Sequence, residues 1–351
     1  MRGDRKNDQG VKEYLQPFET LSYQEQLLRL QHLVEAVLPH YGLHDAQSAL
    51  LQYEDNAVYR ITTRTGEHFV FRVSAAEGHS SAAQRSEMQW LMALRRETEL
   101  LVPEPIPNDA GDLVTMGAVI EVPEPRPCVL LRWIPGNPPM SGIQPAIVEY
   151  IGAFTAQLHQ HAEQFIPPPA FIRPSWDWER LFGTSSVLGC EEAISSLAPH
   201  QQEVLAAVST QMQQALSLLG KDTSLWGLIH ADLHRDNILL HNGEVGVIDF
   251  DDCGWGYYLL DLASVLDSFS RRVVKDPKDY LLLRDAYLRG YDRIRALPAS
   301  LDVHLNTARV MRDMVNVNFI LTSKNASVQT WGRERLDQII AYLEVSSDLG
   351  I

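Results

Sequence analysis

The sequence predicts an α+β fold with two lobes, a small β-rich lobe followed by a larger and mostly helical one. Three observations support this prediction. Strand-like segments gather before residue 134, and helical periodicity dominates after it. Between these regions, Pro135-Gly136-Asn137-Pro138-Pro139 interrupts every regular pattern. We therefore expect one domain over residues 1–134 and a second over residues 135–351, with a cleft between them.

Hydrophobic spacing predicts the elements of the small lobe in chain order. They are a helix over residues 23–38, a hairpin over 58–73, a helix over 86–97, and strands over 113–122 and 128–134. The first helix carries leucine and valine at helical spacing and ends at Pro39. The hairpin is indicated by two β-rich segments that flank the turn at residues 64–67.

The larger lobe shows mostly helical patterns with a single β-rich island. Helices are expected over residues 150–161, within residues 191–219, and from residue 259 onward. The island spans residues 228–250 and contains two short apolar strands.

Composition narrows the function classes. The 351 residues include 30 Lys and Arg against 45 Asp and Glu, a formal charge of −15, which argues against a broad nucleic-acid or anionic-membrane surface. The three cysteines, Cys128, Cys190 and Cys253, form no CxxC pair, and the N-terminus has no secretory pattern. We therefore expect a cytoplasmic protein that binds neither nucleic acid nor membrane.

The β-rich island carries the residues with the clearest chemistry. Asn237 precedes one apolar strand and Asp249 follows the next, with a tight Asn242-Gly243 turn between the strands. A hairpin of this kind brings both polar side chains to the same end, and Asp232 lies on the loop just before it. Two carboxylates and an amide suit Mg²⁺, which prefers oxygen ligands and shares them with substrate phosphates.

The same island resembles a known enzyme family. The pattern His230-x-Asp232 with Asn237, followed by Ile248-Asp249-Phe250, is similar to the catalytic loop and metal-binding segment of the aminoglycoside phosphotransferase and choline kinase-like family. The likeness continues through residues 258–263 and implies a two-lobed, protein-kinase-like fold.

The resemblance implies roles for residues of the larger lobe. Asp232 matches the catalytic carboxylate that accepts or orients the proton of the attacking hydroxyl, and Asn237 and Asp249 match the Mg²⁺ ligands. Asp261 matches a helix-borne aspartate that braces the catalytic loop. His230 and His234 are expected to support that loop. For His234, contact with substrate or phosphate stays an alternative.

The resemblance also implies nucleotide contacts in the small lobe. Arg72 stands where the family has a phosphate-binding lysine, Glu87 matches its ion-pair partner, and Asn56 lies in the nucleotide loop. The backbone at Arg132 and Ile134 would bond adenine. Because Arg and Lys differ in shape and reach, Arg72 leaves open a slow or degenerate kinase. The alternatives are a surface strand residue for Arg72, a solvated helix residue for Glu87 and a turn former for Asn56.

Together these features predict an ATP- and Mg²⁺-dependent kinase that phosphorylates a hydroxyl of a small molecule, such as an amino alcohol, amino acid, aminoglycoside or sugar. Three alternatives remain: a protein Ser/Thr kinase of the same fold, a non-catalytic nucleotide-binding module, and a metal-dependent hydrolase. The hydrolase is suggested by the alternation of His230, Asp232, His234 and Asp236. The sequence specifies neither the acceptor nor the oligomeric state.

Overall fold

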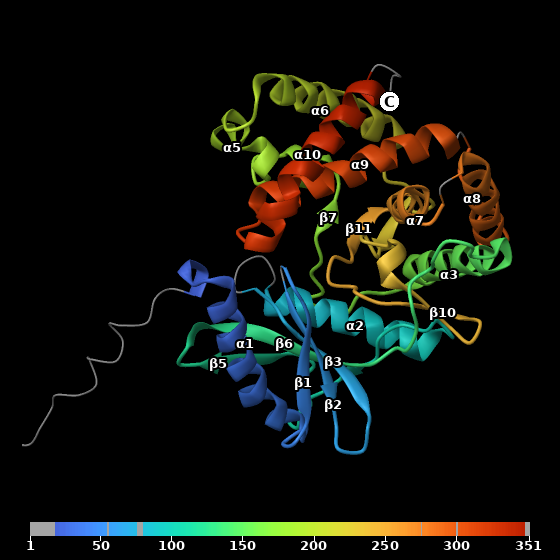
Figure 1. The fold of residues 1–351 in the computed structure, drawn as a ribbon. Coiled ribbons are helices and arrows are strands. Elements are labelled where there is room, and N and C mark those ends of the chain that lie inside the picture. Colours follow the sequence, from blue (N-terminus) through green and yellow to red (C-terminus); the bar gives the residue numbers. More distant parts are fainter. Residues whose placement is uncertain (1–17, 55, 76–79, 275, 300, 348–351) are drawn as a thin grey trace, which may run out of the picture. The chain divides into compact units, whose positions relative to one another are not determined.

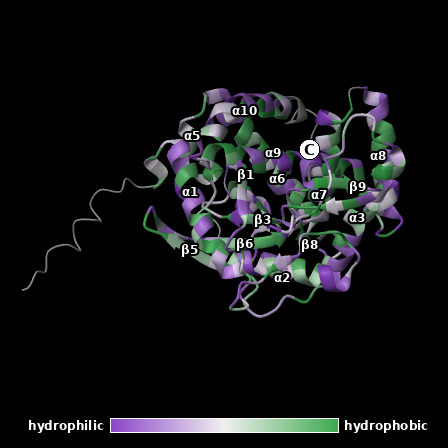
Figure 2. Cartoon of the chain, turned by 60° about the horizontal axis from the view of Figure 1, so that its bottom comes forward, coloured by the Kyte–Doolittle hydropathy of each residue, from purple (hydrophilic) through white to green (hydrophobic). Residues whose placement is uncertain are grey.

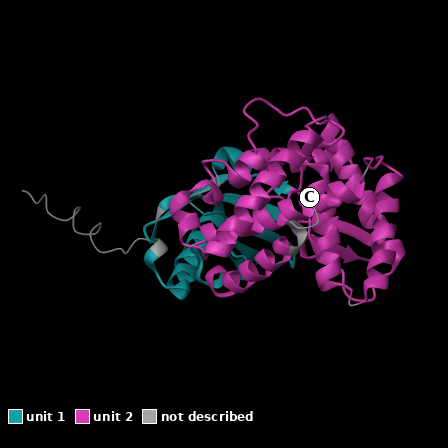
Figure 3. Cartoon of the chain, turned by 90° about the horizontal axis from the view of Figure 1, so that it is seen from above, with its two compact units in different colours: residues 1–84, 105–132, 324–327 teal, residues 85–104, 133–323, 328–351 magenta. Residues whose placement is uncertain are grey.

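The chain divides into two compact units. The computed structural model describes residues 18–54, 56–75, 80–274, 276–299 and 301–347 (Figure 1). Unit 1 comprises residues 1–84, 105–132 and 324–327, and unit 2 comprises residues 85–104, 133–323 and 328–351 (Figure 3). Helix α2 (Ser81–Glu97) begins in unit 1 and continues in unit 2.

Unit 1 is built on an antiparallel sheet. Its strands are β1 (Gln47–Tyr53), β2 (Ala57–Thr62), β3 (His68–Val73), β4 (Pro105–Ile106), β5 (Thr115–Val119) and β6 (Val122–Arg132). Their order is β1-β2-β3-β6-β4, and β5 also pairs with β6. The β2–β3 hairpin confirms the hairpin that the sequence predicts, whereas β1 is an additional strand.

Helix α1 (Tyr23–Val37) forms the core of unit 1 together with this sheet. Its start is fixed by a capping box, in which Ser22 and Glu25 each accept a backbone hydrogen bond from the other. Leu33 on α1 is buried in one cluster with Tyr59 of β2 and Phe71 of β3. Figure 2 shows both hydrophobic and hydrophilic stretches along α1. The short helices η1 (Phe18–Thr20) and η2 (Leu38–Tyr41) flank it.

Two predicted elements of the N-terminal region differ in extent. The helix expected over residues 86–97 begins earlier, at Ser81. The strands expected over 113–122 and 128–134 are β5 and one long β6 that runs through three prolines. Proline is tolerated there because the first half of β6 pairs only with β5, so one side of the strand needs no N–H donor.

Unit 2 is mostly helical, as predicted. Its further helices are α3 (Pro145–Gln164), α4 (Trp178–Phe182), η3 (Val187–Gly189), α5 (Glu191–Ser195), α6 (Pro199–Leu219), α7 (Tyr258–Arg272), α8 (Pro277–Asp292), α9 (Leu301–Thr322) and α10 (Ala326–Ser347), whose first two residues belong to unit 1. Helices α3 and α8 touch backbone to backbone, because a Cβ atom on Gly152 would lie 2.0 Å from the Tyr287 carbonyl oxygen. Among the described helices, none has the length and apolar character needed to cross a membrane.

Two small sheets in unit 2 position the β-rich island. Strands β7 (Ser175–Trp176), β11 (Gly254–Tyr257) and β8 (Trp226–Ile229) form one sheet in the order β7-β11-β8. Strands β9 (Ile238–His241) and β10 (Glu244–Val247) form the hairpin expected from the sequence. Its turn residues, Asn242 and Gly243, have φ angles of 49° and 86°, a left-handed conformation that Asn and Gly adopt readily.

Candidate active site

The loop between β8 and β9 is a tight, self-bonded turn. The His234 amide donates to the Asp232 carbonyl at 2.8 Å, and the Asn237 amide donates to the His234 carbonyl at 3.0 Å. The end of this loop forms the short helix η4 (Arg235–Asn237). Ala231 has a φ of 69°, which is unusual for a residue with a side chain. The surrounding bonds therefore hold this loop in one specific shape.

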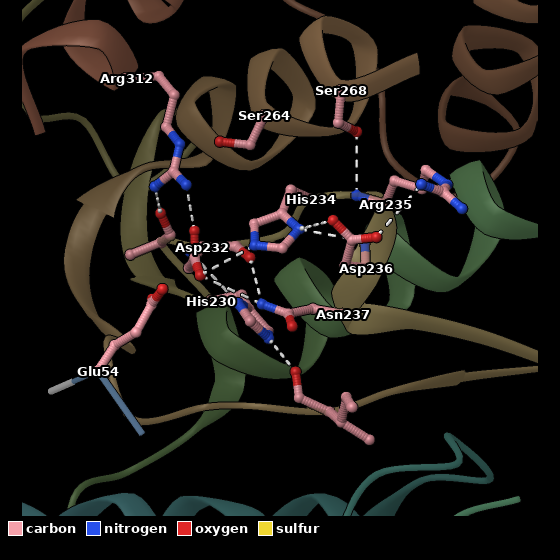
Figure 4. Close-up of polar contacts among 12 residues, drawn as sticks. Glu54, His230, Asp232, His234, Arg235, Asp236, Asn237, Ser264, Ser268 and Arg312 are labelled. Carbon is pink, nitrogen blue, oxygen red and sulfur yellow. Dashed lines mark hydrogen bonds and ion pairs between the residues drawn. The ribbon is translucent and has the colours of Figure 1, made fainter. Parts of the chain in front are cut away.

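Asp232 lies at the centre of the loop's polar contacts (Figure 4). Its Oδ1 accepts a hydrogen bond from the Arg312 guanidinium of α9. Its Oδ2 lies 3.3 Å from His234 Nε2 and 3.2 Å from Asn237 Nδ2. Burial alone would raise the pKa of Asp232, but the charge of Arg312 and then the contact with His234 outweigh burial and hold this pKa well below its usual range. Asp232 is therefore a charged carboxylate near neutral pH.

Asn237 and Asp249 lie at the same end of the β9–β10 hairpin. Val247 pairs with Ile238, and the Ile248 amide donates to the Asn237 carbonyl at 2.9 Å. Asp249 is the next residue after Ile248, so it leaves the hairpin at the end where Asn237 enters it. The Asn237 side-chain NH₂ donates to the Asp232 carbonyl oxygen at 2.9 Å and to its carboxylate. Since both donor bonds point toward Asp232, the amide oxygen is the atom of Asn237 left to serve as a ligand.

This donor set fits Mg²⁺ held jointly with nucleotide phosphates. Mg²⁺ takes one or two protein oxygen ligands in such sites and completes its shell with phosphate oxygens and water. Across the residues that the structure describes, no group of three or more His, Cys, Asp or Glu could hold a metal ion. The oxygen atoms of Asn237 and Asp249 fit this joint mode of binding.

The side chain of Asp261 binds the backbone of the loop between β8 and β9. Its two carboxylate oxygens accept hydrogen bonds from the amides of His230 at 2.9 Å and Ala231 at 2.8 Å. His159 of α3 contacts Asp261 through Nε2 at 3.0 Å and Tyr291 through Nδ1 at 2.9 Å. These contacts form a continuous series of hydrogen bonds from Tyr291 through His159 and Asp261 to the loop. Asp261 and His159 are both fully buried, so the series connects α3, α7 and α8 to the loop away from water.

His230 and His234 use their ring nitrogens for bonds within the protein. His230 accepts from the Asp232 amide through Nδ1 at 3.3 Å and donates from Nε2 to the Ile248 carbonyl at 2.9 Å. His234 accepts from the Asp236 amide through Nδ1 at 3.1 Å, while Nε2 faces Asp232. Both rings therefore connect the loop to its surroundings.

The residues expected to contact nucleotide are divided between the units. Arg72 of β3 and Asn56 belong to unit 1 and are buried, and Arg132 ends β6 with its guanidinium 5.6 Å from the Phe69 ring centre. Side chains alternate along β3, so Arg72 lies on the sheet face opposite Phe71.

Glu87 and Ile134 are buried within unit 2, which also contains Asp232. Arg72 is 3% exposed and Glu87 is 1% exposed, so the alternatives that place them at the surface are wrong. Their ion pair stays a prediction.

Two polar residues of this region are not indicated by the sequence, and a third is indicated only weakly. Arg312 and His159 contact Asp232 and Asp261 from helices far away along the chain. Burial, with the charges of Asp251 and Asp232, raises the pKa of Asp252 to about 8. Asp252 follows the recognisable Ile248-Asp249-Phe250 segment, so its position offers a weak signal. Arg312 and His159 lie on ordinary amphipathic helices and offer none.

Comparison with known proteins places this geometry in a family. Amicoumacin kinase of Bacillus subtilis (strain 168) is 24% identical over 242 residues, 67% of this chain and 67% of that protein. The structure of the microcompartment-associated aminopropanol kinase matches with a TM-score of 0.76 and 25% identity, covering 92% of this chain and 99% of that chain. The structure of amicoumacin kinase hAmiN in complex with AMP-PNP, Ca²⁺ and Ami matches with a TM-score of 0.74 and 20% identity, covering 92% of this chain and 96% of that chain.

These matches confirm the two-lobed, kinase-like α+β fold. The model of the phosphotransferase enzyme family (APH) matches residues 48–297, which include the β-rich island and most of both units. The chain therefore belongs to the phosphotransferase enzyme family and is a small-molecule kinase with an alcohol group as acceptor.

Proposed function

We propose that this protein uses ATP and Mg²⁺ to phosphorylate a hydroxyl group of a small amino alcohol, amino acid, aminoglycoside or sugar. The observation that carries the proposal is the environment of Asp232. This carboxylate is kept charged by Arg312 and His234 and lies against Asn237, at the end of the hairpin that leads to Asp249. A charged, oriented carboxylate beside an oxygen-ligand pair is the arrangement that phosphoryl transfer to a hydroxyl requires.

The proposed roles follow from the chemistry of each group. Asp232 orients the acceptor hydroxyl and accepts its proton as the new bond to the γ-phosphorus forms and the bond between that phosphorus and the leaving oxygen of ADP breaks. Asn237 and Asp249 would hold Mg²⁺, which supplies positive charge to neutralise the phosphates. Asp261, His230 and His234 keep the loop in shape through the bonds described above.

The nucleotide contacts are proposed from the family pattern and from burial. Arg72 binds phosphate oxygens with Glu87 as its ion-pair partner, Asn56 lies in the nucleotide loop, and the backbone at Arg132 and Ile134 bonds adenine. The burial of Arg72 and Glu87 supports a shared role, because charged side chains are rarely buried without a partner. We assign residues 1–134 to the nucleotide-binding lobe and residues 135–351 to the lobe with the catalytic loop and acceptor site.

A small acceptor is favoured over a protein substrate by the segment after Asp249. Residues 254–257 form β11, which pairs with β8 and β7, and Phe250 and Cys253 are buried. Little chain is left between Asp249 and α7 for the long activation segment that protein kinases use. The relative named for aminopropanol supports an acceptor that carries both hydroxyl and amine groups.

Two other functions are less well supported. A metal-dependent hydrolase would need the imidazoles of His230 and His234 as ligands, and their ring nitrogens bond to protein groups instead. A nucleotide-binding module without turnover is suggested only by Arg72 in place of lysine. We further propose that the protein acts in the cytoplasm without nucleic-acid or membrane partners, in line with its acidic composition and free cysteines.

An ADP-release screen tests the proposal. The wild-type protein is incubated with ATP, Mg²⁺ and a panel of hydroxylated amines, amino acids, aminoglycosides and sugars. We expect ADP release that depends on one class of acceptor and is lost in Asp232→Asn. Asp222→Asn, an exposed substitution on the preceding loop, is the matched control and should behave as wild type. ATP binding without acceptor-dependent ADP release from any compound would favour the non-catalytic module.

A further inference from the structure

Arg312 bonds to the catalytic loop from a position 80 residues further along the chain than Asp232. It lies on α9, beyond residues 48–297 that match the family model. One guanidinium nitrogen donates to Asp232 Oδ1, and the other donates to the Ala231 carbonyl at 3.4 Å (Figure 4). The Arg312 side chain is only 14% exposed and that of Asp232 only 20%. The two contacts therefore form a largely buried fork across two successive residues of the loop.

The fork acts on two features that the loop cannot fix alone. Asp232 Oδ2 is held by Asn237 and His234 from within the loop, whereas Arg312 holds Oδ1 from outside it. Ala231 adopts a left-handed backbone, which is unfavourable for an L-residue and needs support from its surroundings. A planar guanidinium holds its two donors in fixed directions toward both groups, whereas an ammonium on a flexible stem does not.

We infer that Arg312 is a positioning residue for the phosphoryl-transfer reaction, fixing the direction of the Asp232 carboxylate and the turn at Ala231 from helix α9. The inference rests on the proposed function insofar as Asp232 is the group that meets the acceptor hydroxyl. Arg312 acts through Asp232 and leaves nucleotide binding to other residues.

Steady-state kinetics of Arg312→Met and Arg312→Lys test this role. Arg312→Met should lower kcat by about 10²-fold, as expected when a reacting group is misplaced, with the KM for ATP within twofold of wild type. Arg312→Lys should recover part of kcat, because it restores one contact of the fork. Arg309→Met is the matched control on the same helix. Arg309 pairs with Asp267 and lies over the Tyr342 ring, so its loss should leave kcat unchanged.

Three kinetic results would overturn the inference. Arg312→Met could match Arg309→Met, which would leave Arg312 without a role in the reaction. It could raise the KM for the acceptor at unchanged kcat, which would make Arg312 a binding group for the acceptor. If kcat for Arg312→Lys is no higher than kcat for Arg312→Met, restoring a contact does not restore turnover, and the guanidinium contacts do not explain the role of Arg312.

A thermal-unfolding cycle provides a readout that needs no turnover. Wild type, Asp232→Asn, Arg312→Met and the double variant are compared by Tm. Because Arg312→Met leaves a largely buried carboxylate without its charged partner, the Tm loss should be much smaller when Asp232 is also changed. Additive Tm losses would contradict the coupling. A wild type without turnover on any acceptor would instead refute the proposed function, while this cycle would still decide whether Arg312 holds Asp232.

Discussion

Asp313 is part of α9 and Asp232 is bonded to Arg312 of the same helix, yet the pKa values of the two carboxylates move in opposite directions. Asp232 accepts direct hydrogen bonds from Arg312 and Asn237, and its pKa falls despite burial. Asp313 is 2% exposed, and burial raises its pKa to about 6 even though Arg271 Nη2 and Arg335 Nη2 lie 3.5 and 3.6 Å away. Within the described residues, no donor bonds to Asp313 Oδ2.

The difference shows what keeps a buried carboxylate charged. Positive charge lies near both groups, but only at Asp232 do donors point at both oxygens. Hydrogen bonds to the charged form offset the loss of hydration, whereas looser ion pairs offset less of it. Under the proposed function, these direct contacts keep the base Asp232 ionised at neutral pH.

The largest expected effect on stability concerns a third buried carboxylate, Asp261, which is held mainly by backbone amides. Asp261→Ala leaves the amides of His230 and Ala231 without an acceptor and His159 without its partner. We expect a loss of about 3 kcal/mol or more in the free energy of unfolding, measured by urea denaturation.

Asp236→Ala is the control for this measurement. Asp236 pairs with Arg272 at the surface, so we expect its loss to cost less than about 1 kcal/mol. Equal losses for Asp261→Ala and Asp236→Ala would contradict the bracing role of Asp261.

The next largest expected effect is a pH dependence of stability that distinguishes Asp313, with its raised pKa, from Asp232, with its lowered pKa. The folded pKa of Asp313 is raised from 3.8 to about 6, so the folded state binds more protons than the unfolded state between these values. The contribution of Asp313 to the free energy of unfolding is therefore complete below pH ~4 and is lost as the pH rises through ~6. The charged groups around it are Arg271, Arg335, Arg309 and Asp267.

The stability of wild type relative to Asp313→Asn should therefore fall by about 2 to 3 kcal/mol between pH ~4 and ~7. Urea unfolding of both proteins across this range measures the difference, and the other titrating groups cancel. A constant difference would show that Asp313 has an ordinary pKa, and a rising difference would show a lowered one.

The smallest effect concerns a partly exposed ion pair between α9 and α7. Arg309 Nη2 lies 3.3 Å from Asp267 Oδ1, with the two side chains 33% and 13% exposed. Arg309→Met should lower the free energy of unfolding by less than about 1 kcal/mol, because water competes for exposed ion pairs. A loss as large as that of Arg312→Met would break the distinction between direct buried contacts and partly exposed ones.

Local patterns predicted much of the fold and of the candidate site. Features that depend only on neighbouring residues can be read from the sequence. They include the Asn242-Gly243 turn, the spacing from His230 to Asn237 and the end of α1. Strand β1 was missed because most of its residues are exposed and no alternating apolar pattern marks it. Strand β7 has only two residues, too few to form a pattern.

The supporting contacts of the site could not be predicted for a different reason. Arg312 and Asp232 are 80 positions apart, and His159 and Asp261 are 102 positions apart. Each pair meets only because helices pack in a particular order, and neither Arg312 nor His159 interrupts the amphipathic pattern of its own helix. A single sequence therefore indicates the reacting group more readily than the residues that hold it.

The central claim is that Asp232 acts on the acceptor hydroxyl and Asp249 binds Mg²⁺, and a comparison of variants at these two positions tests it most directly. ATP affinity is measured with and without Mg²⁺ for Asp232→Asn and Asp249→Ala, together with turnover on the acceptor found by the screen. Asp232→Asn should keep ATP affinity and lose turnover by about 10²-fold or more, as expected for a positioned base, whereas Asp249→Ala should lose the Mg²⁺-dependent part of ATP binding. If Asp232→Asn weakens ATP binding as much as Asp249→Ala does, or if neither variant changes binding or turnover, the account is contradicted.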